Sequence, residues 1–303
     1  MSNFLIILFC LFAGYLLKER HVLPANSFKS INVWIIYIGL PATSFRYLPG
    51  LQWNNDFFVL LLTPIFVLLG AIVFMRLWQT RAGFSRRTAH SLMLVAGFSN
   101  TSFVGFPLVA TYFGETALRW AIISDQMTFF LLSSVGTVIA IKGQPDRNSM
   151  ISPSYLLKRV LSFPPLWGCL AALSIPHFID LSPLESFFAQ LATTVSPLAL
   201  FSIGMQLSFS FYRSEMWAVG ISLMYKLLMA PILLLAICYF SGIRGQVPQI
   251  AVFEMGMPSL VATSMLLQQF NLNSKLGHTV IGFSILCGLL TTRLLYSLLI
   301  SFL

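Results

Sequence analysis

Residues 97–107 read Gly-Phe-Ser-Asn-Thr-Ser-Phe-Val-Gly-Phe-Pro, and they interrupt an apolar run that extends from residue 88 to residue 113. Four consecutive polar residues, Ser99 to Ser102, stand in the middle of this run. Proline lacks the N–H group that a helix needs and clashes with the carbonyl four residues back. Pro107 therefore predicts a break in the helix that frees the carbonyl of Phe103.

A second apolar run, residues 247–270, carries a similar interruption. The stretch Glu254-Met-Gly-Met-Pro-Ser259 places Pro258 where it frees the carbonyl of Glu254. A half-helix that starts inside a membrane offers a partly positive end to an anion, and freed carbonyls can hold a cation. For one such run an ordinary proline kink is the better interpretation. Two such runs favour a binding site, because they occupy corresponding places, the fourth of five apolar runs, in the two halves of the chain.

The composition of the chain excludes a soluble domain. Charged residues make up 9% and hydrophobic residues 57%, whereas soluble domains carry about 25% charged residues. The net charge of +9 comes from only 18 basic residues, which is too sparse for a nucleic-acid-binding face. The solvent must be lipid, and the expected fold is an all-α membrane protein. The lipid bilayer is then the main partner, with no nucleic acid.

Continuous runs of apolar residues predict ten membrane spans, arranged as two halves of five. Residues 1–142 would form the first repeat, residues 143–152 a cytoplasmic linker and residues 153–303 the second repeat. Because five is odd, the second half enters the membrane from the opposite side, as in an inverted repeat. The expected spans are approximately residues 3–17, 30–48, 56–78, 88–113, 117–141, 155–176, 185–208, 215–240, 247–270 and 278–302.

Basic residues predict the orientation of the spans. The loops after odd-numbered spans hold 13 of the 18 Lys and Arg residues, and the opposite side holds 3. The positive-inside rule makes the odd loops cytoplasmic and both termini extracytoplasmic, in a multi-pass protein of the cell membrane. The first run, residues 3–17, lacks a preceding basic residue and is interpreted as a span rather than a signal peptide.

Motifs for enzyme chemistry are missing from the sequence. It holds no GxSxG, HExxH or P-loop pattern, so no catalytic residue is expected. The four cysteines lie in separate apolar runs without a Cys or His neighbour, so neither a metal site nor a disulfide framework is expected. No cofactor is expected beyond a coupling ion.

A few ionisable residues lie inside spans, where each needs a physical reason. Asp125 stands in Ser124-Asp-Gln-Met-Thr128 with Gln126 beside it, and Glu254 stands just before the second break. Lys226 and Arg293 are candidate charge partners. A structural ion pair is the alternative for Lys226 and Glu254, and Arg293 is more simply explained by reaching the outer surface.

The interrupted run Ser99-Asn-Thr-Ser-Phe-Val-Gly-Phe-Pro-Leu108 resembles the asparagine-containing break of the auxin efflux carrier family. Further matching segments follow in the family's order. They are Gly39-Leu-Pro-Ala-Thr-Ser-Phe45, Ser196-Pro-Leu-Ala-Leu-Phe-Ser-Ile-Gly204, Lys226-Leu-Leu-Met-Ala-Pro231 and Gly256-Met-Pro-Ser259.

This resemblance implies ten helices in a five-plus-five inverted repeat, with crossed fourth and ninth helices and a fold shared with bile-acid sodium symporters. It implies a scaffold of spans one, two, six and seven, and a moving domain of spans three to five and eight to ten. Family substrates include auxin and small carboxylates such as malate. The short linker fits the bacterial branch. Arg293 departs from the family, which often has proline there.

The resulting hypothesis is a secondary transporter for a small organic anion, with an elevator-like movement implied by the family. Asp125 and Glu254 are the candidates to carry a coupling proton or sodium ion. A channel or uniporter and an intramembrane enzyme are the alternatives, and a homodimer is left open. The candidate binding residues are Ser99, Asn100, Thr101, Ser102, Asp125, Gln126, Glu254, Met257 and Ser259, with helix breaks at Pro107 and Pro258.

Overall fold

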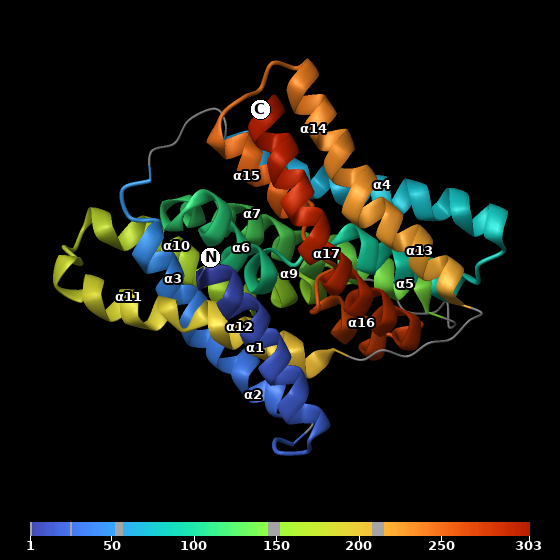
Figure 1. Cartoon of the computed structure of the whole chain (residues 1–303), viewed down its shortest axis with the longest axis horizontal. Helices are drawn as coiled ribbons and strands as arrows, with labels where there is room; N and C mark the ends of the chain where they lie inside the picture. The colour runs from blue at the N-terminus through green and yellow to red at the C-terminus, as the bar shows by residue number, and fades with distance from the viewer. Residues whose placement is uncertain (1, 25, 52–56, 145–151, 208–214) are drawn as a thin grey trace. The chain divides into compact units, whose positions relative to one another are not determined.

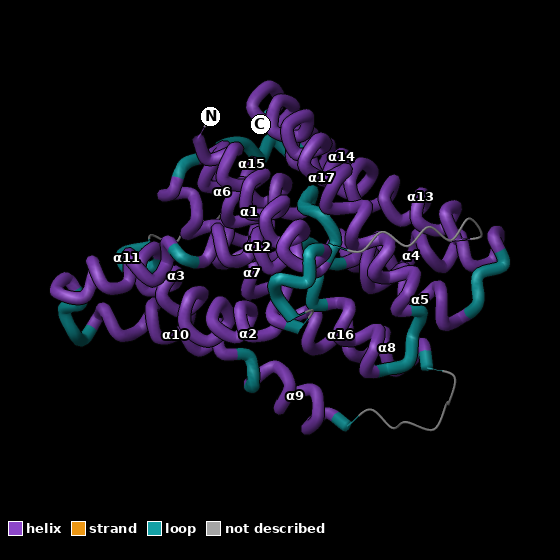
Figure 2. Tube along the Cα trace, turned by 60° about the horizontal axis from the view of Figure 1, so that its bottom comes forward, coloured by secondary structure: helices purple, strands orange, loops and turns teal. Residues whose placement is uncertain are grey.

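The structure is a computed structural model that describes residues 2–24, 26–51, 57–144, 152–207 and 215–303. Within these ranges the chain is helical, and the only β-type pairing is a single bridge between Ser99 and Ser259 (Figure 2). The all-α expectation is confirmed. Most of the expected linker, residues 145–151, lies outside the described residues.

The chain forms two compact units, each built from three separate segments. Unit 1 comprises residues 1–54, 102–122 and 161–207, and unit 2 comprises residues 55–101, 123–160 and 208–303. The segment 102–122, which the family resemblance implies to be part of the moving domain, belongs to unit 1.

The helices of unit 1 come mainly from the expected spans one, two, six and seven (Figure 1). They are α1 (Ser2–Glu19), α2 (Ser27–Trp34), α3 (Leu40–Tyr47), α6 (Phe106–Phe113), α10 (Pro164–Ser174), α11 (Glu185–Thr193) and α12 (Val195–Gln206), with short 3-10 turns at Glu115–Ala117, Ile175–His177 and Ser182–Leu184. Helix α7 (Leu118–Leu131) begins in this unit and continues in unit 2.

Two glycines allow α1 and α12 to pack backbone against backbone. A Cβ atom at Gly14 would lie 2.1 Å from the carbonyl oxygen of Phe201, and one at Gly204 would lie 2.1 Å from that of Leu11. Small residues permit such close approach between helices in lipid, where dispersion rather than the hydrophobic effect holds helices together.

Unit 2 contains the expected spans three and eight to ten, together with parts of spans four, five and six. Its helices are α4 (Phe57–Ala82), α5 (Arg86–Gly97), the rest of α7, α8 (Thr137–Gly143), α9 (Pro153–Leu161), α13 (Met216–Met224), α14 (Ala230–Phe240), α15 (Gln246–Met255), α16 (Thr263–Gln269) and α17 (Ser274–Phe302).

Wider π-helical turns precede three of the prolines. Pro41, Pro107 and Pro231 each stand second in an α-helix that follows such a turn. The turns are Ile35–Gly39, Thr101–Gly105 and Tyr225–Met229, and a fourth is Leu132–Gly136. Because proline can neither donate an N–H nor tolerate the carbonyl four residues back, a locally wider turn accommodates its ring.

The break predicted at Pro107 is therefore displaced. The chain is continuously helical from Thr101 to Phe113, and the interruption lies earlier, at residues 98–100. Phe98 is extended, with φ −120° and ψ 130°. In the second interrupted run, Pro258 lies within the break, between the end of α15 and the start of α16.

Several helices are long and apolar enough to cross a membrane. Expected span six is bent by 62° between Pro153–Leu161 and Pro164–His177, because Pro164 and Pro165 cannot continue the preceding helix. The full count of ten spans and the inverted repeat stay predictions. The long apolar helices of the described chain are Phe57–Ala82, Glu115–Gly143, Ser182–Gln206, Met216–Phe240 and Ser274–Phe302.

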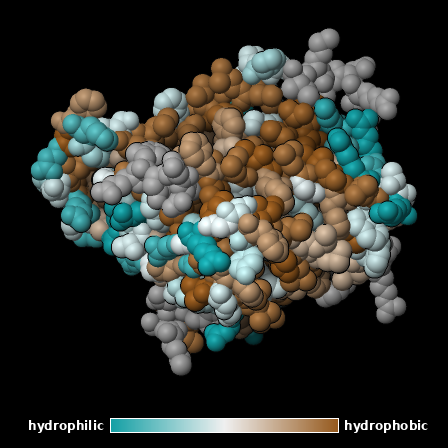
Figure 3. Space-filling view, turned by 90° about the horizontal axis from the view of Figure 1, so that it is seen from above, coloured by the Kyte–Doolittle hydropathy of each residue, from teal (hydrophilic) through white to brown (hydrophobic). Residues whose placement is uncertain are grey.

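Exposed apolar side chains form stripes along these helices. On α17, Leu286, Leu290 and Leu294 lie one turn apart and are 45%, 74% and 65% exposed. Hydrophobic residues cover much of the face seen in Figure 3. Such a surface is unfavourable in water and suits contact with lipid.

Candidate functional site

The two helix breaks pair with each other inside unit 2. The backbone N–H of Asn100 donates to the carbonyl of Pro258 at 2.8 Å, and that of Leu260 donates to the carbonyl of Phe98 at 3.0 Å. These bonds satisfy backbone groups that the breaks remove from their helices. Gly288 of α17 makes room for the turn, since a Cβ there would lie 2.5 Å from the Pro258 ring.

The side chain of Asn100 is buried beside this bridge without a hydrogen-bond partner. Asn100 is 1% exposed, and neither its amide nitrogen nor its amide oxygen is bonded to any described residue. The hydroxyl of Ser259, on the other side of the bridge, is likewise buried and unbonded. Unpaired polar groups at such depth are costly and need an explanation, such as a ligand that they bind.

Lys226 reaches both breaks from the π-helical turn between α13 and α14. Its ammonium group donates to the hydroxyl of Ser99 and, at 3.0 Å, to the carbonyl of Met255. Ser99 also donates to that carbonyl at 3.1 Å. Lys226 has 0% exposure, so the site holds a fully buried lysine that can carry a positive charge.

Two carboxyl groups accompany this cation. Glu254 has 0% exposure, neither of its oxygens has a hydrogen-bond partner among the described residues, and it interacts electrostatically with Lys226 and Asp125. Asp125 of α7 accepts a hydrogen bond of 2.5 Å from the hydroxyl of Thr101. The structure thus brings together residues that lie more than a hundred positions apart in the sequence.

The other expected site residues are placed less centrally. Met257 is fully buried within the second break. Gln126 is half-buried, and its side-chain oxygen has no partner among the described residues. Ser102 is buried and belongs to unit 1. Arg293 lies exposed on α17 and is not among the groups that pair with the breaks.

Two groups at the site have no counterpart in the sequence-based set. The hydroxyl of Ser284 on α17 accepts a hydrogen bond of 3.0 Å from the backbone N–H of Ser259, and the carbonyl of Met255 accepts from Lys226 and Ser99. A hydroxyl in the middle of an apolar span was the only signal for Ser284. Pro258 predicted a freed carbonyl at Glu254, but that carbonyl accepts from the backbone N–H of Met257, and the carbonyl one residue later is the one that meets Lys226.

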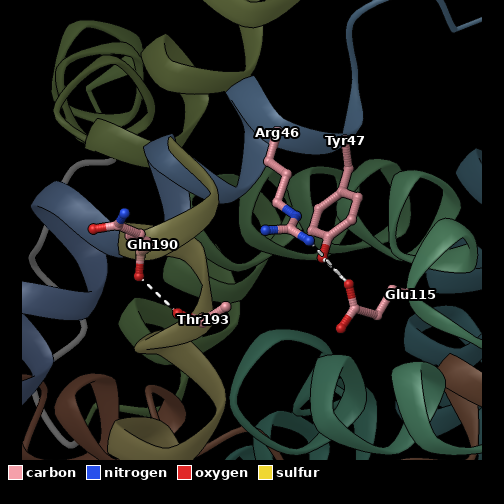
Figure 4. Close-up of polar contacts among 5 residues, drawn as sticks. All are labelled: Arg46, Tyr47, Glu115, Gln190 and Thr193. Carbon is pink, nitrogen blue, oxygen red and sulfur yellow. Dashed lines mark hydrogen bonds and ion pairs between the residues drawn. The ribbon is translucent and has the colours of Figure 1, made fainter. Parts of the chain in front are cut away.

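Unit 1 contains a separate cavity of about 290 Å³. Arg46 and Tyr47 both point toward Glu115 at its edge and donate to the same carboxylate oxygen at 3.1 Å (Figure 4). Thr193, which lines the cavity, donates to the carbonyl of Gln190 at 2.7 Å. Most of the lining is apolar, and the hydroxyls of Thr43 and Thr111 also donate to backbone carbonyls.

Potential metal ligands do not cluster in the described residues. No group of three or more His, Cys, Asp and Glu side chains stands close enough there to hold a metal ion. The polar groups at the breaks are instead hydroxyls, carbonyls, an amide, an ammonium and carboxyls, which suit an organic ion and a proton or a hard cation.

Comparison with known families bears on this arrangement. The sequence profile of the family described as "Membrane transport protein" matches residues 1–296. The chain belongs to this family. It is the family of the auxin efflux carriers, so the resemblance seen in the sequence is confirmed, and the family consists of membrane transporters rather than enzymes.

Relatives of this transporter match over nearly their whole length. An "Uncharacterized transporter" of Methanothermobacter thermautotrophicus is 27% identical over 93% of this chain and 92% of its own. Another, of Methanocaldococcus jannaschii, is 26% identical over 91% of each chain. A Rhizobium meliloti protein named "Putative malonate transporter" is 21% identical over 94% of this chain and 92% of its own.

Proposed function

We propose that the protein is a secondary transporter of a small organic carboxylate, which binds at the paired helix breaks. The observation that carries the proposal is the Asn100 side chain, which is buried beside the bridge to Pro258 with neither amide atom bonded to a described residue. An amide can donate to a carboxylate and accept from a cation or a protonated group at once.

The charge at the breaks supports an anionic substrate. Lys226 supplies a buried positive charge next to Ser99, the residue before Asn100. Ser259 adds, from the opposite break, a hydroxyl that is bonded to none of the described residues. A small carboxylate would find a donor amide, a donor hydroxyl and a compensating charge in one place. The relative named as a malonate transporter makes dicarboxylates such as malonate the first compounds to test.

The carboxyl groups support coupling to protons. Lys226 provides one positive charge, whereas Glu254 and Asp125 provide two carboxyls in the same buried cluster. If both carboxyls were ionised, a buried negative charge would stay uncompensated, which is costly at membrane depth. A proton held by this pair compensates it, and an anionic substrate would favour the uptake of a further proton by the second carboxyl.

The two-unit organisation supports movement of one unit against the other. Spans one, two and seven and most of span six fall in unit 1, and the paired breaks and all of spans three and eight to ten fall in unit 2. A site enclosed within one unit can travel with that unit, as an elevator mechanism requires. In this proposal unit 2 carries the substrate.

Substrate binding can be tested on the purified protein. A ligand that binds only the folded state raises its melting temperature, so a panel of small mono- and dicarboxylates should contain at least one stabilising compound. That compound should then support counterflow in proteoliposomes, with saturation and competition by unlabelled substrate. Neutral amides of the same size serve as controls. A flux that rises linearly with concentration without competition would instead indicate a channel.

A further inference from the structure

Lys226 holds a position that oxygen atoms of both breaks create. Its ammonium contacts the Ser99 hydroxyl from the first break and the Met255 carbonyl at the end of α15. Met255 is the last residue of its helix, so its carbonyl points beyond the helix instead of bonding within it. Hydroxyl and carbonyl oxygens at broken helices are the ligands that hard cations such as Na⁺ use in transporters.

The backbone around Lys226 fixes the ammonium in this position. Lys226 is the second residue of the π-helical turn Tyr225–Met229, which precedes Pro231. The neighbouring Tyr225 is buried, and its hydroxyl donates a hydrogen bond of 2.7 Å to the carbonyl of Val67. Its ring stacks on that of Phe74, with 5.2 Å between the ring centroids. The wide turn and this anchor lie directly beside the lysine, whose ammonium contacts both breaks.

A neighbouring carboxyl favours the protonated form of Lys226 and opposes the cost of its burial. Glu254, which directly precedes Met255 in the sequence, interacts electrostatically with Lys226. A buried ammonium without oxygen partners or a counter-charge would be strongly unfavourable. Here it has two oxygen partners and a nearby carboxyl, so the protein supplies the cation itself.

We propose that Lys226 is a tethered cation: its ammonium occupies the position between the two breaks that a coupling sodium ion would need, so transport is independent of sodium. The inference rests on the proposed function only for its statement about transport. The occupancy of the position is a property of the empty protein, and it can be measured without any substrate.

The experiment removes the tether and supplies the cation from solution. Lys226→Ala leaves Ser99 and Met255 oxygens around a cavity, so its melting temperature should fall by roughly 5 to 10 °C. Ammonium or methylammonium should restore much of this loss, and choline, which is too large, should not. Ser222→Ala is the matched control, because Ser222 is buried one turn earlier on α13 and its hydroxyl has no partner among the described residues.

Wild-type protein provides the second measurement. Its melting temperature and its transport rate should be the same in sodium and choline media at equal ionic strength. Saturable stabilisation of the wild type by sodium would overturn the proposal, as would a Lys226→Ala protein that small amines stabilise no more than they stabilise Ser222→Ala. If Lys226→Ala fails to fold, Lys226→Val retains more of the side-chain volume and still leaves room for ammonium, and the same two measurements decide.

The outcomes separate this inference from the proposed function. Amine rescue without any stabilising carboxylate would support the tethered cation and contradict the proposed substrate class. A stabilising carboxylate together with sodium-dependent binding would support the substrate class and contradict the tethered cation.

Discussion

The backbone N–H of Asn100 lies 2.8 Å from the carbonyl oxygen of Pro258 and donates a hydrogen bond to it. This bond joins two helix breaks that are 158 residues apart and makes them one structural element. This bond uses the backbone of Asn100 and does not involve its side chain. A substitution of the side chain can therefore change transport without breaking the bond that joins the breaks.

Asn100→Ala should abolish or strongly weaken transport with little change in the melting temperature. The amide atoms have no partner among the described residues, so their removal breaks no protein hydrogen bond. A hydrogen bond to a charged ligand contributes about 1.5–3 kcal/mol, so the affinity for substrate should fall roughly tenfold to a hundredfold. Counterflow in proteoliposomes and thermal melting measure the two effects.

Asn32→Ala is the matched control for this substitution. The side-chain oxygen of Asn32 accepts a hydrogen bond of 2.5 Å from the hydroxyl of Ser202 within unit 1. Its removal should therefore lower the melting temperature and leave substrate affinity unchanged. Normal uptake by Asn100→Ala would show that this amide only fills space.

Glu254→Gln and Asp125→Asn should remove the dependence of transport on a pH gradient and leave substrate exchange intact. The amides keep the shape of the carboxyl groups and cannot carry an exchangeable proton. Substrate accumulation driven by an imposed pH gradient is the measurement. Glu115→Gln is the control, since this carboxyl side chain is 63% exposed in unit 1. If both variants keep a wild-type response to the gradient, the two carboxyls are structural.

Gly14→Ala and Gly204→Ala should each destabilise unit 1. The added Cβ atom would lie 2.1 Å from a backbone carbonyl oxygen of the opposing helix, so α1 and α12 must separate. Overpacking of this kind costs about 1–3 kcal/mol, which thermal melting in detergent would detect. Gly220→Ala on α13 is the control, because no described residue outside its own stretch of helix lies within 4 Å of its Cβ position. Unchanged melting of both α1 and α12 variants would contradict the close packing.

Single cysteines should report the predicted orientation in intact cells. In a background without the four native cysteines, Asp180→Cys should react with an impermeant reagent from outside, and Gln144→Cys should react only after permeabilisation. Both expectations follow from the excess of Lys and Arg after odd-numbered spans. Labelling of position 144 in intact cells, with protection of position 180, would reverse the topology.

The local sequence was enough to predict the lipid environment, the all-α fold class and the two interrupted apolar runs. An apolar run that is long enough to cross a bilayer needs lipid whatever its neighbours are, and polar residues or prolines within it interrupt it through local backbone chemistry. The stretch Ser99–Ser102 and the segment around Pro258 could therefore be identified from their residues alone. The family membership followed from the same segments.

Tertiary structure decided the position of the first break and the partners at both. A proline reveals that a helix must change locally, but whether it widens into a π-helical turn, as before Pro107, or breaks depends on what packs around it. The hydrogen bond from Lys226 to Ser99 joins residues that are 127 positions apart in the sequence. The bond from the backbone N–H of Ser259 to the hydroxyl of Ser284 joins residues that are 25 positions apart. Such pairs depend on the register between helices distant in the sequence, and hydrophobic patterning within one helix carries no information about that register.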